Sequence, residues 1–159
     1  MEQFCGKVAL VTGGGSGIGR ATSLAFARKG AKVVVAGRTR DKIEETKEMI
    51  KELGGEAIAV QVDTSFDEQV KKMLQITINQ FGHLDFACNA AGVGGKLVPT
   101  ADVTEDDFDL TMAVNLKGVW LCMKYEINQM LKQGNGVIVE YLIYQWLRWY
   151  SKRSNLRSK

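Results

Sequence analysis

The sequence has little of what would break up, cross-link or anchor a chain. Its 159 residues include a single proline, Pro99, which argues against a disordered or low-complexity chain. No apolar run is long enough to span a bilayer. The acidic residue and short apolar run at the start predict no signal peptide. We therefore expect one folded domain with a sizeable core, located in the cytoplasm and without a membrane partner.

Cysteine and histidine are also scarce. Cys5, Cys88 and Cys122 are odd in number, widely spaced and without a CxxC pair, so we expect neither a disulfide framework nor a zinc site. The only histidine, His83, follows a predicted helix and has no metal-binding partner or nucleophile near it in the sequence. We therefore expect a surface residue there rather than a catalytic base, and no metal.

Charge is unevenly distributed along the chain. The net charge is +3, but residues 140–159 carry +4 and residues 1–139 carry −1. The same twenty residues hold two of the three tryptophans and three of the four tyrosines. So sharp a change in composition predicts a boundary, with a domain at 1–139 and an atypical basic and aromatic tail at 140–159.

Within the domain, short apolar runs alternate with longer amphipathic stretches. The apolar runs predict strands at 7–12, 32–37, 56–63, 84–92 and 136–139. The amphipathic stretches predict helices at 17–30, 40–54, 65–82 with Ser65 as N-cap, and 104–134 opened by Thr104. This alternation predicts an α/β fold, a Rossmann-like doubly wound parallel sheet of about five strands.

The segment "TGGGSGIGR" lies between the first predicted strand and the first predicted helix. There Gly13 can form the turn, Gly17 can allow close approach of a pyrophosphate, and Gly19 can allow tight helix–sheet packing. The free N–H groups at the start of a helix favour phosphate. A tight strand–helix turn without a ligand would use the same glycines, but the position after the first strand favours nucleotide binding.

Three motifs occur in an order typical of one family. They are T-G-x-x-x-G-x-G (Thr12, Gly13, Gly17, Gly19), "NAAG" at 89–92, and Asn115 within "AVNLKG". Over residues 7–139 the sequence resembles the short-chain dehydrogenase/reductase family. The resemblance implies a seven-stranded sheet, a nicotinamide cofactor, a small carbonyl or alcohol substrate and homo-oligomers. It also implies a cofactor site built from Thr12, Gly13, Ser16, Gly17, Ile18, Gly19, Arg38, Val62, Asp63, Asn89, Ala90 and Gly92. Asp63 would contact the adenine edge; alternatively, it is a plain acid near a helix N-terminus.

The end of the second predicted strand indicates which cofactor is preferred. A site for NAD places a carboxylate there for the ribose 2′-hydroxyl, whereas this sequence has Gly37 followed by Arg38. The planar guanidinium suits a 2′-phosphate, and Arg40 is a second candidate for it. The alternative is that both arginines only begin a solvated loop. We expect NADP to be preferred over NAD.

Most of the family's catalytic residues have no counterpart here. The resemblance implies a serine just after the fifth strand, a tyrosine with a lysine four residues later, and an asparagine that supports a water for proton relay. Only the asparagine, Asn115, is present. Four residues after Tyr141, Tyr144 and Tyr150 come glutamine, arginine and serine. We therefore expect the chain as printed to be inactive.

The tail suggests a reason for this absence. If each codon from Glu140 on is read one nucleotide late, permitted codon choices give Asn-Thr-Ser-Ser at its start and Tyr-Ala-Ala-Ser at its end, as the family has. Trp146 and Trp149 each have one codon, and both become glycine in that frame. We therefore expect an out-of-frame tail and an intact dehydrogenase as parent. Two alternatives are a non-catalytic NADP-binding module or regulatory partner, and a tail that binds nucleic acid or an anionic membrane surface. We expect no nucleic-acid partner.

Overall fold

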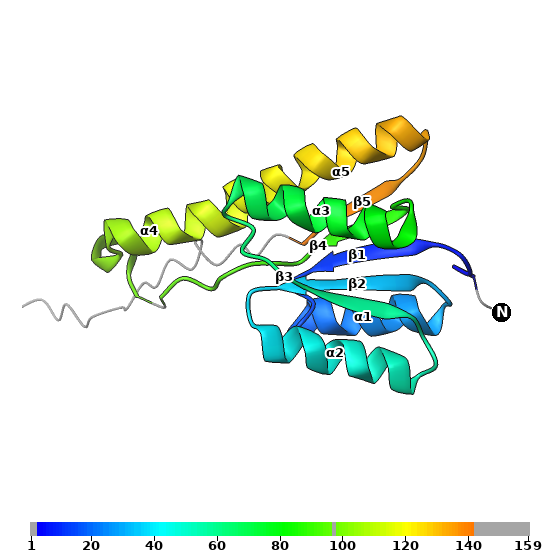
Figure 1. Ribbon diagram of the computed structural model, residues 1–159. Coiled ribbons are helices and arrows are strands. Elements are labelled where there is room, and N and C mark those ends of the chain that lie inside the picture. The colour runs from blue at the N-terminus through cyan, green and yellow to red at the C-terminus, as the bar shows by residue number, and fades with distance from the viewer. Residues whose placement is uncertain (1–2, 97, 142–159) are drawn as a thin grey trace, which may run out of the picture.

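A parallel five-stranded sheet forms the centre of the molecule. The computed structural model describes residues 3–96 and 98–141, so only Glu140 and Tyr141 of the tail predicted at 140–159 are among the described residues. The strands lie in the order β3-β2-β1-β4-β5 (Figure 1). Their bounds are β1 Val8–Thr12, β2 Lys32–Gly37, β3 Ala57–Gln61, β4 Phe86–Asn89 and β5 Val137–Glu140. The predicted α/β fold class is confirmed.

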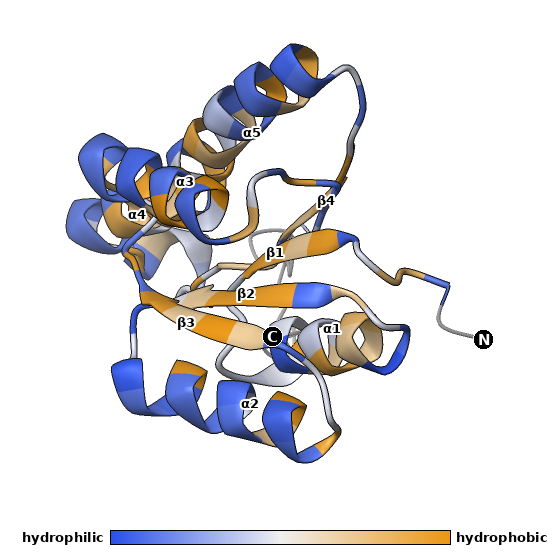
Figure 2. Ribbon diagram, turned by 45° about the vertical axis from the view of Figure 1, so that its right-hand side comes forward, coloured by the Kyte–Doolittle hydropathy of each residue, from blue (hydrophilic) through white to orange (hydrophobic). Residues whose placement is uncertain are grey.

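Helices cover both faces of this sheet. The helices α1 (Gly17–Arg28) and α2 (Arg40–Glu52) lie on one face, and α3 (Asp67–Phe81) and α5 (Val119–Gln133) on the other (Figure 1). The strands are the most apolar part of the ribbon, between helices with polar outer sides (Figure 2). Each face has its own apolar core, and buried strands of this kind are typical of a sheet covered on both sides.

The predicted long helix at 104–134 is a rod of three parts. It consists of α4 (Glu105–Met112), a π-helical turn η2 (Ala113–Gly118) and α5, preceded by the 3₁₀ turn η1 (Thr100–Asp102). Thr104 caps α4 as predicted, since its hydroxyl accepts a hydrogen bond from the Asp107 N–H at 3.2 Å. The π-helical turn contains Asn115. Such turns redirect side chains and often occur at functional sites.

The prediction that Ser65 caps the third helix is wrong. The helix begins two residues later, at Asp67, and its N-cap is Phe66. The N–H and hydroxyl groups of Ser65 both donate to the carboxylate of Asp63, at 3.0 and 2.7 Å. A local side-chain turn thus competes with the helix for these residues.

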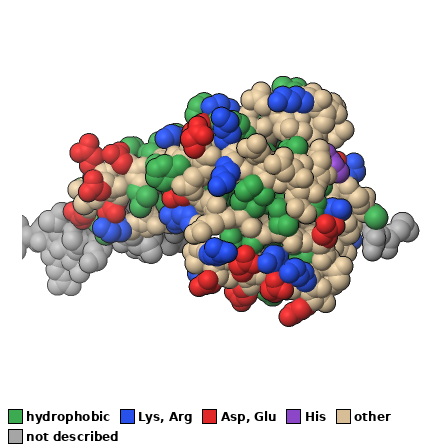
Figure 3. All heavy atoms as spheres, viewed as in Figure 1, with side chains coloured by type: hydrophobic (Ala, Val, Ile, Leu, Met, Phe, Trp, Pro, Cys, Tyr) green, Lys and Arg blue, Asp and Glu red, His purple; other side chains and the backbone are tan. Residues whose placement is uncertain are grey.

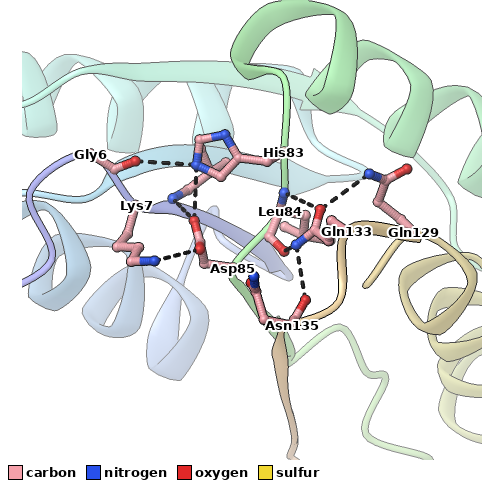
Figure 4. A network of polar contacts seen from close by, with 9 residues as sticks. Gly6, Lys7, His83, Leu84, Asp85, Gln129, Gln133 and Asn135 are labelled. Atoms are coloured by element: carbon pink, nitrogen blue, oxygen red, sulfur yellow. Dashed lines mark hydrogen bonds and ion pairs between the residues drawn. The ribbon is translucent and has the colours of Figure 1, made fainter. Parts of the chain in front are cut away.

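A polar network joins the amino-terminal ends of β1, β4 and β5 (Figure 4). The glycine loop lies at the opposite ends of the strands. The buried Asp85 carboxylate accepts hydrogen bonds from the Lys7 ammonium and the Val8 N–H, both at 2.9 Å. His83 Nε2 lies 3.1 Å from the same carboxylate, on an exposed ring as predicted. Burial would raise the pKa of Asp85, but the bonds from Val8 and Lys7 outweigh it and hold this pKa below its usual range.

The same network fixes the end of α5 (Figure 4). The Gln133 side chain accepts a hydrogen bond from the Leu84 N–H and donates to the Leu84 carbonyl, as a strand partner would. It also donates to the Asn135 carbonyl at 3.0 Å, at the turn into β5. The amino-terminal ends of these strands are therefore joined by side-chain hydrogen bonds.

Candidate cofactor site

The candidate site lies at the carboxyl ends of β1 and β4. From β1 the chain proceeds outward to β2 and β3, whereas β4 and β5 lie on the other side of β1. The loops after β1 and β4 therefore separate at this point, which is where open α/β sheets bind ligands. Residues 13–16 come from the first loop and residues 90–93 from the second.

The two loops touch at Gly13. Its backbone has a φ of +67°, and a Cβ atom there would lie 2.6 Å from the Ala90 carbonyl oxygen. Only glycine fits such a position without displacing backbone. The close contact thus sets the distance between the two loops that form the site.

One glycine of this loop, Gly17, leaves room for a phosphate. Gly17 begins α1 with a φ of +51°, and a Cβ atom there would have no neighbour within 4 Å. Gly19 is packed instead, because a Cβ atom there would collide with the Gly13 carbonyl. An open space before a helix N-terminus, with free N–H groups, fits the pyrophosphate of a dinucleotide. Ser16 is the N-cap of this helix, and Ile18 is exposed in its first turn.

A cleft of about 230 Å³ lies above these loops. Five of the predicted cofactor residues line it, namely Gly13, Ser16, Arg38, Val62 and Gly92. Asp63 lies in an adjoining hollow, which Arg38 and Val62 also line. The structure thus brings together residues from the ends of β1, β2, β3 and β4, which are up to 79 positions apart in the sequence.

Two predicted residues lie beneath the cleft rather than on its wall. Thr12 and Asn89 are buried, and their side chains are 3.4 Å apart across β1 and β4. The Thr12 hydroxyl accepts a hydrogen bond from the Ala91 N–H at 3.2 Å. This pair therefore supports the loop after β4 from below.

Asn89 also joins two carboxylates that sequence analysis missed. Its amide nitrogen donates to Glu126 at 2.8 Å and to Glu140 at 2.9 Å. One oxygen of each carboxylate is buried and has no partner among the described residues. Burial raises the pKa of Glu126 to about 7, against the Asn89 bond, and the charge of Glu140 adds to the rise. Burial likewise raises the pKa of Glu140. The only sequence signal for Glu126 is an acid on the apolar side of a helix.

The side chain of Asn115 is fully engaged with the backbone of Val93. Its oxygen accepts from the Val93 N–H at 2.8 Å, and its nitrogen donates to the Val93 carbonyl at 2.9 Å. Asn115 thereby fixes the segment that follows Gly92. Its predicted role in proton relay stays a prediction.

Asp63 is bonded within its own turn. Its carboxylate accepts from Ser65, and its N–H donates to Gln69 at 2.8 Å. Because α3 begins at Asp67, Asp63 is not an acid of the first helical turn. Its predicted contact with adenine stays a prediction.

The two arginines after β2 are placed differently. Arg38 lines the cleft, and its carbonyl accepts a hydrogen bond from Gln61 at 2.9 Å. Arg40 instead lines a separate hollow beside β3 and does not line the cleft. Thr39 and Lys42 line the cleft with Arg38, and sequence analysis missed both. The lysine could have been found by noting that helical spacing places it in the first turn after Arg38.

Residues 3–96 and 98–141 contain no feature typical of a membrane span or a metal site. No helix there is long and apolar enough to cross a membrane. No group of three or more histidine, cysteine, aspartate or glutamate side chains in this part of the chain could hold a metal ion.

Known proteins are similar to the part of this chain that forms the sheet and the cleft. The family model described as "short chain dehydrogenase" matches residues 7–141. An uncharacterized oxidoreductase of Thermotoga maritima is 47% identical over 140 residues, which cover 86% of this chain and 53% of that protein. The levodione reductase of Leifsonia aquatica is 35% identical over 139 residues, which cover 86% of this chain and 52% of that protein.

Solved structures agree with the fold. The structure of NAD⁺-bound xylitol dehydrogenase superposes with a TM-score of 0.85 at 34% identity, covering 87% of this chain and 53% of that one. The structure of levodione reductase superposes with a TM-score of 0.84 at 35% identity, covering 86% and 54%. The chain spans about half the length of the curated relatives it matches.

Proposed function

The chain belongs to the short-chain dehydrogenase/reductase family, and on this premise we propose that residues 1–139 form the NADP-binding domain of an oxidoreductase. The family binds nicotinamide cofactors, which supply or accept a hydride. The observation that carries the proposal is the glycine cradle, in which Gly13 and Gly19 are packed against backbone while Gly17 faces open space. We propose that the intact parent acts on a small carbonyl or alcohol substrate. We also propose that it forms a homo-oligomer and that it is located in the cytoplasm.

The proposed contacts follow from the cleft. The N–H groups at the start of α1, with Gly13, Ser16, Gly17 and Ile18, hold the pyrophosphate. Val62 and Asp63 border the adenine, and Asn89, Ala90 and Gly92 border the other half of the cofactor. Asn115 positions the chain after Gly92 through its two bonds to Val93.

The preference for NADP rests on the end of β2. No carboxylate stands at Gly37 to repel a 2′-phosphate, and Arg38 lines the cleft beside it. Its guanidinium makes no ion pair with any described residue. A charge-assisted hydrogen bond contributes roughly 1.5–3 kcal/mol, which is about tenfold or more in affinity.

Titration of the 159-residue chain with NADPH and NADH tests this preference. We expect NADPH to bind at least about tenfold more tightly. We expect Gly37→Asp to reverse the order, because the new carboxylate would accept from a 2′-hydroxyl and repel a 2′-phosphate. Equal or tighter binding of NADH by the unmodified chain would contradict the preference.

We further infer that this chain is catalytically incomplete and that the tail predicted at 140–159 departs from the family pattern after residue 141, where the match to the family model ends. Within these residues no tyrosine is followed by a lysine four positions later. The site of Glu140 supports an out-of-frame reading, because its carboxylate shares the Asn89 amide with the buried Glu126 and keeps one oxygen without a partner among the described residues. The shifted frame places a neutral asparagine there.

Sequencing the gene from the codon of Val137 through several dozen codons past Lys159 tests this inference. We expect one inserted or deleted base to restore the serine, the tyrosine and the lysine. A confirmed frame with no such reading beneath it would overturn the inference. It would favour the second candidate, a cofactor-binding module without catalysis. NADPH binding without oxidation in the presence of a panel of small ketones would then support that module.

A further inference from the structure

We propose that Lys42 is a specificity-determining residue of the cofactor site, where its ammonium group binds the 2′-phosphate of NADP together with Arg38. This inference rests on the proposed function. Lys42 lies in the first turn of α2 and lines the cleft of about 230 Å³ with Gly37, Arg38 and Thr39. Two cations thus approach the same space from the loop after β2 and from the helix that follows it.

The charge of Lys42 is available to a ligand. Acidic and basic side chains intermingle along α2 (Figure 3), and three of its four glutamates are paired with residues other than Lys42. Glu45 pairs with Arg20, Glu44 with Lys47, and Glu48 with Lys47 and Lys51. Among the described residues no carboxylate pairs with Lys42 or Arg38. Two unpaired cations on one cleft favour a phosphate group, which carries more negative charge than a single carboxylate.

A clamp from α1 fixes the position of Lys42. The Arg20 guanidinium donates to the Gly15 carbonyl at 2.7 Å, to the Thr46 hydroxyl at 3.0 Å and to Glu45 at 2.5 Å. The Thr46 hydroxyl in turn donates to the Lys42 carbonyl at 3.1 Å. A Cβ atom at Gly15 would lie 2.9 Å from the Cβ of Lys42. The first turn of α2 is therefore held against the glycine loop.

The position of Lys42 favours the 2′-phosphate over the pyrophosphate. The pyrophosphate is served by Gly17 and the N–H groups that begin α1. Lys42 lies instead beside Gly37 and Arg38, at the end of the strand where dinucleotide folds read the ribose 2′ position.

Arg40 provides a matched control. It carries the same charge two residues earlier on α2, but it lines the hollow of about 420 Å³ that Gln69 and Lys72 also line. A substitution there removes one positive charge from the same helical turn without touching the cleft. Any difference between the two positions therefore reports contact with the ligand rather than the field of the whole helix.

The experiment measures dissociation constants for NADPH and NADH with the full 159-residue chain and its Lys42→Gln, Lys42→Arg and Arg40→Gln variants. We expect Lys42→Gln to weaken NADPH roughly tenfold and to leave NADH within twofold. We expect Lys42→Arg to retain most of the NADPH affinity, and Arg40→Gln to change neither cofactor. Unfolding midpoints of all variants show whether they are folded, and Lys42→Met keeps the aliphatic stem if Lys42→Gln lowers stability.

Each other outcome has a distinct meaning. If Lys42→Gln weakens the binding of NADPH and NADH equally, the lysine contacts a group that both cofactors share, such as the pyrophosphate, and the inference is overturned. An unchanged NADPH affinity, or an equal loss in Arg40→Gln, would overturn it as well. If the unmodified chain binds neither nucleotide, the proposed function fails first, and this inference fails with it.

Discussion

Gly13 has a left-handed backbone conformation, and a Cβ atom there would lie only 2.6 Å from the Ala90 carbonyl oxygen. We expect Gly13→Ala to lower the free energy of unfolding by about 3 kcal/mol or more, because strain in this region and overpacking add together. Gly82 is the control, since its φ is +82° and a Cβ atom there would have no neighbour within 4 Å. Gly82→Ala should lose only the strain, roughly 1–2 kcal/mol. Urea unfolding of both variants measures the difference. Equal losses of unfolding free energy would contradict the prediction, because the Ala90 carbonyl would then move aside at little cost.

The buried carboxylate of Glu126 makes stability depend on pH. Its pKa is raised to about 7 in the fold, chiefly by burial, whereas the unfolded chain has the ordinary value of 4.5. The fold therefore holds the proton more tightly, and the stability present below pH 4.5 is lost as pH rises to 7, by an amount on the order of 3 kcal/mol.

We expect Glu126→Gln to remove most of this loss. The variant should be more stable than the unmodified chain at pH 8 and similar to it at pH 4.5, as measured by urea unfolding at both pH values. Glu140, whose pKa is also raised, accounts for a remaining slope. An unchanged pH slope in the variant would show that Glu126 is not the group that titrates.

Single residues differ in how far the sequence could predict them. Gly13 and Arg38 belong to local patterns, in which a turn and a strand end restrict the residue type, so they were found without a structure. Lys42 and Glu126 were missed because their roles depend on what packs against them. Lys42 lines the cleft on a helix that Arg20, from another helix, joins to the glycine loop.

The rod formed by α4, η2 and α5 depends on the π-helical turn to place Asn115. In this turn the Asn115 side chain makes two hydrogen bonds to the backbone of Val93. We expect Asn115→Ala to lower the free energy of unfolding by roughly 1–3 kcal/mol, because both backbone groups of Val93 lose a partner. Amide hydrogen exchange should also become faster at Val93.

Asn128 is the control for this rod. It lies on α5, and among the described residues its side chain donates to the Lys124 carbonyl of its own helix alone, at an exposed site. Asn128→Ala should therefore change the stability by less than about 0.5 kcal/mol. A similar loss in both variants, or unchanged exchange at Val93, would contradict the role that we give to Asn115.

Whole elements were easier to predict than their ends. The five strands and the main helices follow from apolar periodicity, which reflects burial and does not require partners to be known. The start of α3 was misplaced because Asp63 captures the N–H and hydroxyl of Ser65 before the helix begins. The π-helical turn was missed because it depends on packing, as at Gly118, where a Cβ atom would lie 2.8 Å from the Thr64 hydroxyl.

At the scale of the whole molecule, the sheet is unevenly covered. The edge strand β5 pairs with β4, and Ile138 packs into the core beneath α5. Val137 and Val139 point to the opposite face, where they are 54% and 55% exposed. An edge strand with an apolar face tends to associate with other chains. We therefore expect the 159-residue chain to self-associate as its concentration rises.

Sedimentation velocity over a hundredfold range of concentration measures this association. We expect the double variant Val137→Lys, Val139→Lys to weaken it at least about tenfold, since charges on an edge strand oppose pairing. Leu53→Lys, at an exposed apolar residue that ends α2, should change it by less than twofold. Leu131 on α5 is 73% exposed and offers a competing surface. If Leu131→Lys abolishes the association while the β5 variant retains it, the rod and not the uncovered strand is the surface through which the chains meet.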